Sequence, residues 1–172
     1  MACSNLTAGI PLDCIEGIGG VEVVYIANGP VQAITEDAGL ITAITVDGAP
    51  LTPSDFFRFE MPKQTSSFTE THNVSLENGT LFYNQDLSLV FNKMTLDKRN
   101  QINLIAKATH MVVVYKDNAG QFWSVGIEKG AYVTAGTTVS GTAFGDRSGY
   151  ELTISGLEKN PSYEVDSSIV EA

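Results

Sequence analysis

This sequence has little of what enzymes and disulfide-rich exported proteins need. Its 172 residues include only two cysteines, Cys3 and Cys14, and only two histidines, His72 and His110. Two cysteines near one end cannot make a disulfide framework, so we expect both to be thiols in a reducing compartment. The scarcity of histidine leaves few candidates for a general base or a metal ligand.

Long apolar runs are also missing. No run reaches the about 20 residues that a membrane helix needs, so no membrane association is expected. The first residues, Met-Ala-Cys-Ser-Asn, lack the basic and apolar regions of a signal peptide. A mean hydropathy of +0.04 with 43% hydrophobic residues nevertheless argues against disorder. We expect one domain spanning residues 1–172, with residues 1–20 as a candidate N-terminal arm.

Positive charge is scarce and unevenly placed. The chain has 10 Lys and Arg against 20 Asp and Glu, a formal net charge of −10. Residues 1–86 hold eleven acids against Arg58 and Lys63, whereas residues 87–172 hold nine acids against eight bases. Phosphate contacts need Lys and Arg, so a direct grip on nucleic acid is disfavoured. The acidic half presents a negative field, for which solubility is the simpler explanation.

No catalytic constellation stands out. Glu70 and His72 share a strand face, a pairing that is more typical of a solvated surface than of a metal or proton-transfer site. The segment Gly141–Gly149 lacks the Gly-Lys-Ser/Thr of a phosphate loop, and Ser148 is misplaced for Gly-x-Ser-x-Gly. We therefore expect no enzyme, and no catalytic, cofactor-binding or metal-ligating residue.

The clearest positive signal is a long β-hairpin over about residues 65–91. Two alternating runs meet at Asn78-Gly79, the strongest short-range signal for a two-residue type I′ turn. Pairing Glu77 with Thr80 makes paired residue numbers sum to 157. The expected pairs are Leu76–Leu81, Val74–Tyr83, Phe68–Leu89 and Ser66–Phe91 on one face, and Ser75–Phe82, Asn73–Asn84, Thr71–Asp86 and Thr69–Ser88 on the other.

This register sorts apolar side chains onto one face of the ribbon and small polar ones onto the other. A slip of one residue would undo that sorting. A soluble enzyme rarely needs such a ribbon, whereas a protein that lines a wet, uncharged to acidic surface does. The polar face carries Thr69, Thr71, Asn73, Asn84, Asp86 and Ser88.

The rest of the chain reads as strands around one helix. Thr95 is a candidate N-cap with Asp97 in the first turn, so we expect a helix over about residues 96–109, with Ile102, Ile105, Ala106 and Ala108 as its buried stripe. Residues 136–149 are expected to form a loop or edge segment. The other expected strands are Val21–Ala27, Val31–Thr35, Leu40–Val46, Asp55–Glu60, Met111–Lys116, Gln121–Ile127, Tyr150–Ser155 and Tyr163–Val165.

About ten strands with frequent turn signals predict a mainly β fold, an antiparallel β-sandwich or barrel with one flanking helix. Long strands with unpaired edges invite pairing with another chain, so oligomerisation is expected from the fold alone.

The order of these parts resembles bacteriophage tail tube proteins. The matching stretch runs from the Phe68–Phe91 ribbon through Lys93-Met94-Thr95 and the helix into Met111–Tyr115 and Gln121–Ile127. The ending Gly141–Glu158 also resembles the tails of structural proteins from phages of gut and aquatic Bacteroidota. The resemblance implies a two-sheet fold whose long hairpin joins neighbouring subunits in lining a ring.

The resemblance further implies a virion protein, made in the host cytoplasm and placed in the tail. Its partners would be copies of itself, in stacked hexameric rings, and other tail or neck proteins. DNA would pass without specific binding, because a ring with six times the formal charge of one chain repels phosphates. The lumen-facing candidates are then Thr69, Thr71, Asn73, Asn84, Asp86 and Ser88, with Glu70 at a subunit contact or beyond the apolar cover.

Two other readings stay open. A capsid decoration or neck-ring subunit would share the acidic, β-rich composition but would assemble on a shell or portal. A secreted β-sandwich adhesion or binding module would need an export route, and usually an aromatic platform or an acidic metal-binding loop.

Overall fold

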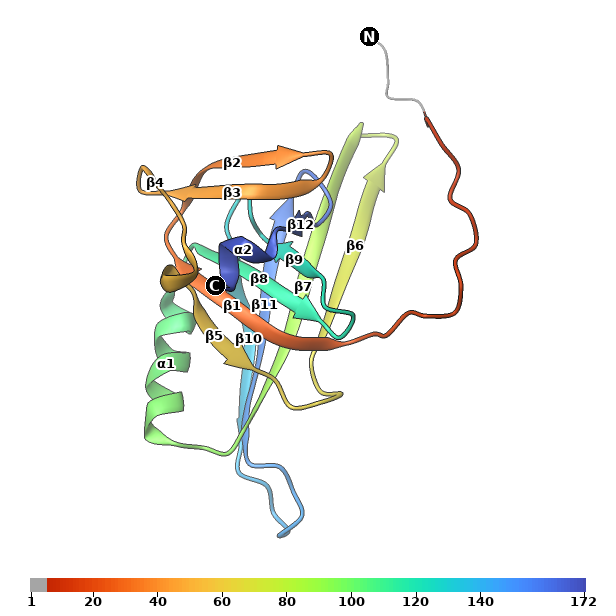
Figure 1. The fold of residues 1–172 in the computed structure, drawn as a ribbon. Helices are drawn as coiled ribbons and strands as arrows, with labels where there is room; N and C mark the ends of the chain where they lie inside the picture. Colours follow the sequence, from red (N-terminus) through yellow and green to blue (C-terminus); the bar gives the residue numbers. More distant parts are fainter. Residues whose placement is uncertain (1–5) are drawn as a thin grey trace.

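Two β-sheets face each other in the computed structural model, which describes residues 6–172 (Figure 1). The larger one, sheet A, has the order β2-β3-β12-β9-β8-β1-β5, with β4 paired to β3. β12 runs parallel to β3, and the other pairs are antiparallel. The strands of sheet A are β1 (Val21–Asn28), β2 (Val31–Asp37), β3 (Leu40–Val46), β4 (Ala49–Pro50), β5 (Phe57–Glu60), β8 (Met111–Asp117), β9 (Phe122–Val125) and β12 (Glu164–Val165).

The smaller sheet, sheet B, is antiparallel throughout and has the order β10-β11-β7-β6. Within the described residues neither sheet closes into a barrel. The fold is mainly β and sandwich-like, which is the first of the two predicted alternatives. The strands of sheet B are β6 (Ser67–Ser75), β7 (Thr80–Asn92), β10 (Tyr132–Val139) and β11 (Gly149–Glu158).

Apolar side chains form two clusters, one on each face of β1 and β8. The first lies between the sheets, where Val24 and Val113 of sheet A meet Leu87 of sheet B. The second lies on the opposite face and is closed by β3 and by α2 (Ser167–Val170), which contributes Ile169. Residues 23–27 are therefore buried without interruption, and β1 does not alternate between buried and exposed side chains beyond its first residues.

The long hairpin exists, but its turn differs from the one expected. Ser75 pairs with Thr80, so four residues form the loop and paired numbers sum to 155. Gly79 has a φ of +62°, whereas Asn78 is not left-handed, which excludes the expected two-residue type I′ turn. The register is therefore offset by two residues from the predicted one. An offset of two keeps every side chain on its predicted face, because the side-chain period of a strand is two.

Helix α1 (Leu96–Lys107) begins where the sequence predicts and ends two residues earlier. The Thr95 hydroxyl accepts a hydrogen bond from the Lys98 backbone N–H at 3.3 Å, which confirms the N-cap. Ile105 is buried and Ile102 is half-buried against the inter-sheet cluster, whereas Ala106 is exposed. Helix α2 and the short 3-10 helix η1 (Pro53–Asp55) were not predicted.

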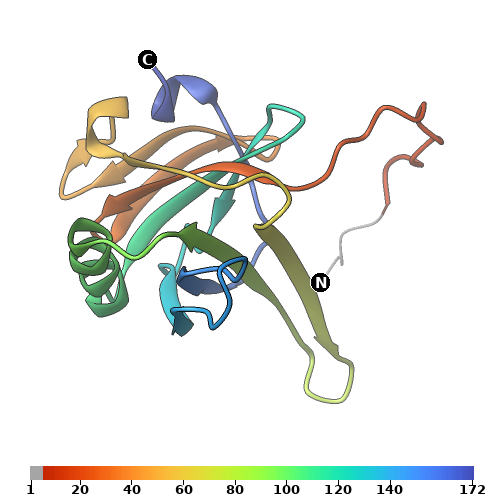
Figure 2. The same cartoon turned by 90° about the horizontal axis from the view of Figure 1, so that it is seen from below.

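Residues 6–20 contain no helix or strand and run away from the two sheets (Figures 1 and 2). This matches the expected arm, of which residues 1–5 lie outside the described part of the chain. Cys14 is exposed on this segment, and Cys3 lies outside the described residues. Part of the expected loop at residues 136–149 is strand, because β10 forms one edge of sheet B.

Candidate functional site

The face of sheet B that points away from sheet A is lined mostly by small polar side chains, with Phe82 and Leu157 as exposed apolar members. Thr69 lies directly opposite Asp86, and Thr71 directly opposite Asn84, so these four share a face. Strand alternation adds Asn73 on β6 and Ser88 on β7 to it. The structure thus brings all six predicted residues together, although three of the predicted cross-strand pairs that link them are wrong by two positions. We call this surface the polar face.

Strand β11 extends the polar face beyond the hairpin. Ser155 lies opposite Asp86, and Thr153 opposite Ser88. Sequence reasoning missed these residues as site members, although Glu151, Thr153 and Ser155 alternate with apolar residues along the strand. The missing information was the strand order, because nothing local in the sequence places β11 beside β7.

Asp86 is the hydrogen-bonding centre of the polar face. Its Oδ2 accepts from Asn84 Nδ2 at 2.8 Å, and its Oδ1 accepts from the Ser155 hydroxyl. The Ser155 hydroxyl in turn lies 2.9 Å from the Thr134 hydroxyl. These contacts tie β7, β11 and the β10 edge together and hold the carboxylate in a fixed position on the sheet.

The strands of sheet B contain no Lys or Arg. All 10 bases of the chain lie elsewhere, while the four strands carry Glu70, Asp86, Glu151 and Glu158. Glu151 is exposed and pairs with Arg147 of the β10–β11 loop. The strands of the polar face are therefore neutral to acidic, and the one base that reaches it from the β10–β11 loop, Arg147, is paired with a carboxylate.

Both edges of sheet B are open among the described residues. β6 pairs only with β7, and β10 pairs only with β11. These edge strands contain nine and eight residues and no proline. Unpaired backbone groups along such edges are a template for strand pairing with another chain.

The end of the β6–β7 hairpin projects beyond the body of the protein (Figure 2). There, the hairpin face opposite the polar face carries apolar side chains. Val74, Leu76 and Leu81 are 66%, 94% and 50% exposed, and Val74 lies directly opposite Leu81. We call these three residues the hairpin tip. Sheet A does not cover them, so they form an apolar surface on an element that reaches outward.

Glu70 lies inside the sandwich and not at the surface. Its Oε2 accepts from Gln85 Nε2 at 2.9 Å and from the Ser162 backbone N–H at 2.7 Å, while His72 Nε2 lies 3.2 Å from its Oε1. The expectation of Glu70 beyond the apolar cover is therefore not met within this chain. The carboxylate orders backbone and amide groups, which accounts for the Glu70–His72 pair without catalysis.

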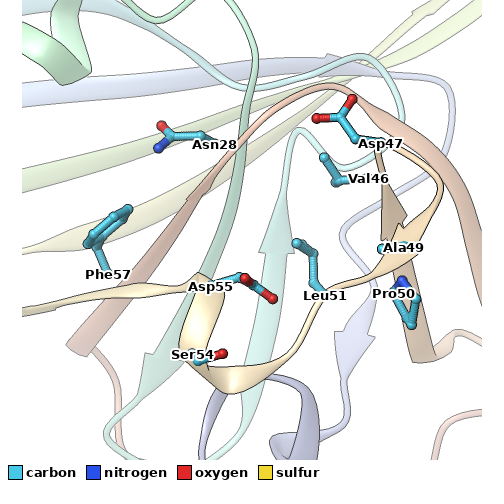
Figure 3. Close-up of a pocket in the computed structure, with 9 residues that line it drawn as sticks. All are labelled: Asn28, Val46, Asp47, Ala49, Pro50, Leu51, Ser54, Asp55 and Phe57. Carbon is cyan, nitrogen blue, oxygen red and sulfur yellow. The ribbon is translucent and has the colours of Figure 1, made fainter.

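Two carboxylates, those of Asp47 and Asp55, border one cavity of the protein. This cavity of about 400 Å³ is lined by Asp47 from the β3–β4 turn and by Ser54 and Asp55 from η1 (Figure 3). The Asp55 carboxylate already accepts hydrogen bonds from the backbone N–H and the hydroxyl of Thr52 at 2.8 Å, and the backbone bond lowers its pKa most. The walls of this cavity contain no His, Cys or Lys, and the Ser54 hydroxyl lies 2.8 Å from the Thr52 hydroxyl.

Residues 6–172 contain neither a cluster of metal-binding side chains nor a helix that could span a membrane. No group of three or more His, Cys, Asp or Glu side chains in that range is placed to hold a metal ion. No helix there is long and apolar enough to cross a membrane.

The loop between β10 and β11 presents one aromatic side chain. Phe144 is fully exposed at its end, while the Thr142 and Ala143 backbone N–H groups each donate to Asp146 Oδ2 at 2.8 Å. These bonds, the Ala143 one first, lower the pKa of Asp146. The carboxylate thus braces a loop whose tip is free to contact another molecule.

No protein-family model matches this chain, and no curated protein matches it significantly.

Proposed function

We propose that this protein is a virion structural protein, a tail tube subunit that assembles into rings around a channel for DNA. The observation that supports the proposal is sheet B itself: one face is mostly polar, its strands carry no Lys or Arg, and both edges are open. Pairing β6 of one copy with β10 of the next would continue the sheet from subunit to subunit. A head-to-tail contact of this kind generates a ring when its rotation closes, and closure removes the exposed edges.

In such a ring the polar face lines the lumen. Hydroxyl, amide and carboxylate groups keep that surface hydrated, and the absence of Lys and Arg gives DNA phosphates no counter-charge. DNA would then slide without being held. The hairpin tip reaches past the body of its own subunit and would bury Val74, Leu76 and Leu81 against a neighbour.

Negative-stain electron microscopy of the purified, concentrated protein at moderate salt tests the assembly directly. We expect rings or stacked tubes with a central channel. A protein that stays monomeric alone and joins only a capsid shell or portal would instead be a decoration or neck-ring subunit. The braced, exposed Phe144 is the feature that favours this second candidate, because it suits docking onto a different protein.

The lumen assignment has its own test. Thr71 is exposed on the polar face, so Thr71→Lys adds a ring of positive charges to the proposed lumen while leaving the hydrogen bonds of Asp86 intact. Assembled Thr71→Lys tubes should retain short duplex DNA at low salt and release it as salt rises. Thr35→Lys, on an exposed position of β2 in sheet A, is the matched control. Equal DNA retention by both variants would count against a lumen formed by the polar face.

A further inference from the structure

The arm exposes apolar side chains that nothing on its own chain covers. Over residues 6–20 the chain leaves the sandwich without forming a strand or helix. Its five large apolar residues are all at least 62% exposed, and four are essentially fully so. These residues are Leu6, Ile10, Leu12, Ile15 and Ile18. Exposing several apolar side chains to water is unfavourable, and docking on an apolar surface would bury them.

The base of the arm is held at one end of sheet A. Asn118 in the β8–β9 turn donates from its side chain to the Gly19 carbonyl at 2.7 Å and from its backbone to the Gly20 carbonyl at 3.1 Å. This turn lies at the opposite end of β8 from α1, and the arm continues away from the body (Figure 1). The direction of exit therefore points the arm away from the body of its own chain.

An apolar groove lies on the other side of the molecule, between β5 and α1. Two adjoining cavities of about 270 and 120 Å³ share Phe59 and Gln101 in their walls. Phe57 and Leu104 border the smaller cavity and are 58% and 61% exposed. β5 pairs only with β1, so it is an edge strand, and the groove runs alongside it.

The arm and helix α1, which forms one side of the groove, carry opposite charges. Residues 6–20 carry Asp13 and Glu16 and no base, a formal −2. Helix α1 carries Lys98, Arg99 and Lys107 against the single acid Asp97, a formal +2 in a chain whose net charge is −10. In an acidic protein this helix is the element to which an acidic segment is attracted.

We propose that the arm of one copy docks in the β5–α1 groove of a second copy. Ile10 and Leu12 are two residues apart, so both point to one side of an extended chain, with a spacing of about 7 Å. Pro11 between them has no N–H, which suits a segment lying beside an edge strand with that position turned to solvent. Ile10 and Leu12 fill the two cavities, and Asp13 and Glu16 lie against the bases of α1.

Cysteine cross-linking of full-length protein tests this contact, because Cys14 already lies two residues beyond Leu12. In a Cys3→Ser background, one protein keeps Cys14 and is labelled with heavy nitrogen. The other carries Cys14→Ser with Gln101→Cys, which places a thiol on the wall shared by both cavities. After mixing and brief treatment with a short bis-maleimide, mass spectrometry identifies the mixed dimer.

We expect at least tenfold more mixed dimer than with Asp37→Cys, an exposed position on β2 at the far edge of sheet A. Adding Ile10→Asp and Leu12→Asp to the arm should remove this excess. Those side chains are 96% and 101% exposed, so the substitutions leave the folded body intact. A mixed dimer no more abundant than the control overturns the proposal. A third variant, which keeps Cys14 and adds Gln101→Cys, tests the alternative. If it cross-links only within one chain, the arm occupies its own groove and the proposal is overturned.

The inference rests on the self-association in the proposed function, but not on the ring or the channel. A mixed dimer without rings or tubes in the microscope would support arm docking and overturn the tail tube. Tubes without the mixed dimer would support the tail tube and overturn arm docking.

Discussion

The Gln85 side chain joins the two sheets through the backbone of Gly126. Its Oε1 accepts the Gly126 N–H at 2.9 Å, and its Nε2 donates to Glu70 at 2.9 Å, while only 2% of the residue is exposed. One buried amide thus links β7, β6 and the turn after β9. A polar group buried this deeply is stable only while all its partners are present.

Gln85→Ala should lower the free energy of unfolding by about 2–4 kcal/mol, because it leaves the Gly126 N–H and the Glu70 carboxylate short of a partner. Urea unfolding followed by tryptophan fluorescence measures this loss. Gln121→Ala, at an exposed position, should change stability by less than about 0.5 kcal/mol. Similar values for the two variants would show that the Gln85 amide has no structural role.

Gly156 is predicted to tolerate no side chain. A Cβ there would lie 2.6 Å from Gly126 Cα and 2.9 Å from Gly126 N, both backbone atoms that cannot move aside easily. Gly156→Ala should therefore cost about 2–4 kcal/mol through overpacking. Gly145→Ala is the matched control, because nothing lies within 4 Å of its Cβ position. Thermal unfolding of both variants is the measurement, and equal melting temperatures would refute the close approach.

The stability of the protein should depend on the protonation of Glu158. Burial raises the pKa of this carboxyl, although the Lys129 and Glu128 backbone N–H groups oppose the shift by donating to it at 3.0 and 3.2 Å. Because the pKa of Glu158 is higher in the folded state than in the unfolded state, the contribution of this carboxyl to stability is fully present below its unfolded-state pKa. It is lost as pH rises through the folded-state pKa.

Comparison with Glu158→Gln isolates this effect, because glutamine does not titrate. The stability of the wild type relative to the variant should be greatest near pH 4 and fall as pH rises toward 7. Urea unfolding at several pH values measures it, with Glu77→Gln in the exposed hairpin loop as the control. If the stability of the wild type relative to Glu158→Gln instead grew with pH, folding would lower the pKa of Glu158 and the prediction would be wrong.

The hairpin tip should matter for assembly and not for folding. Leu81 is 50% exposed, so Leu81→Asp should change the free energy of unfolding of the monomer by less than about 1 kcal/mol. It should reduce the assembled fraction in sedimentation at least tenfold, because the carboxylate would be buried at the contact. Thr35→Asp on β2 is the control. Unchanged assembly of Leu81→Asp would exclude the hairpin tip from the interface.

Local chemistry explains which predictions from the sequence are confirmed. The Thr95 cap and the start of α1 depend on neighbouring residues alone. The two faces of the β6–β7 hairpin were also predictable, because side-chain alternation survives an error of two residues in register. The length of the hairpin loop was not predictable. The dipeptide Asn-Gly is compatible with a type I′ turn, in which both residues are left-handed, and also with a longer loop in which Gly79 alone is left-handed.

The amino-acid sequence by itself determined the mainly β class, the polar face of the hairpin and its lack of bases, because these follow from residue type and a period of two. Only the tertiary structure decided that β11 lies beside β7 and extends that face, that Glu70 is held inside by Gln85, and that a second cluster covers the other face of β1 and β8. Each of these depends on contacts between residues far apart in the chain. The free energy that selects such contacts comes from packing the whole set of strands at once, and no local pattern encodes it.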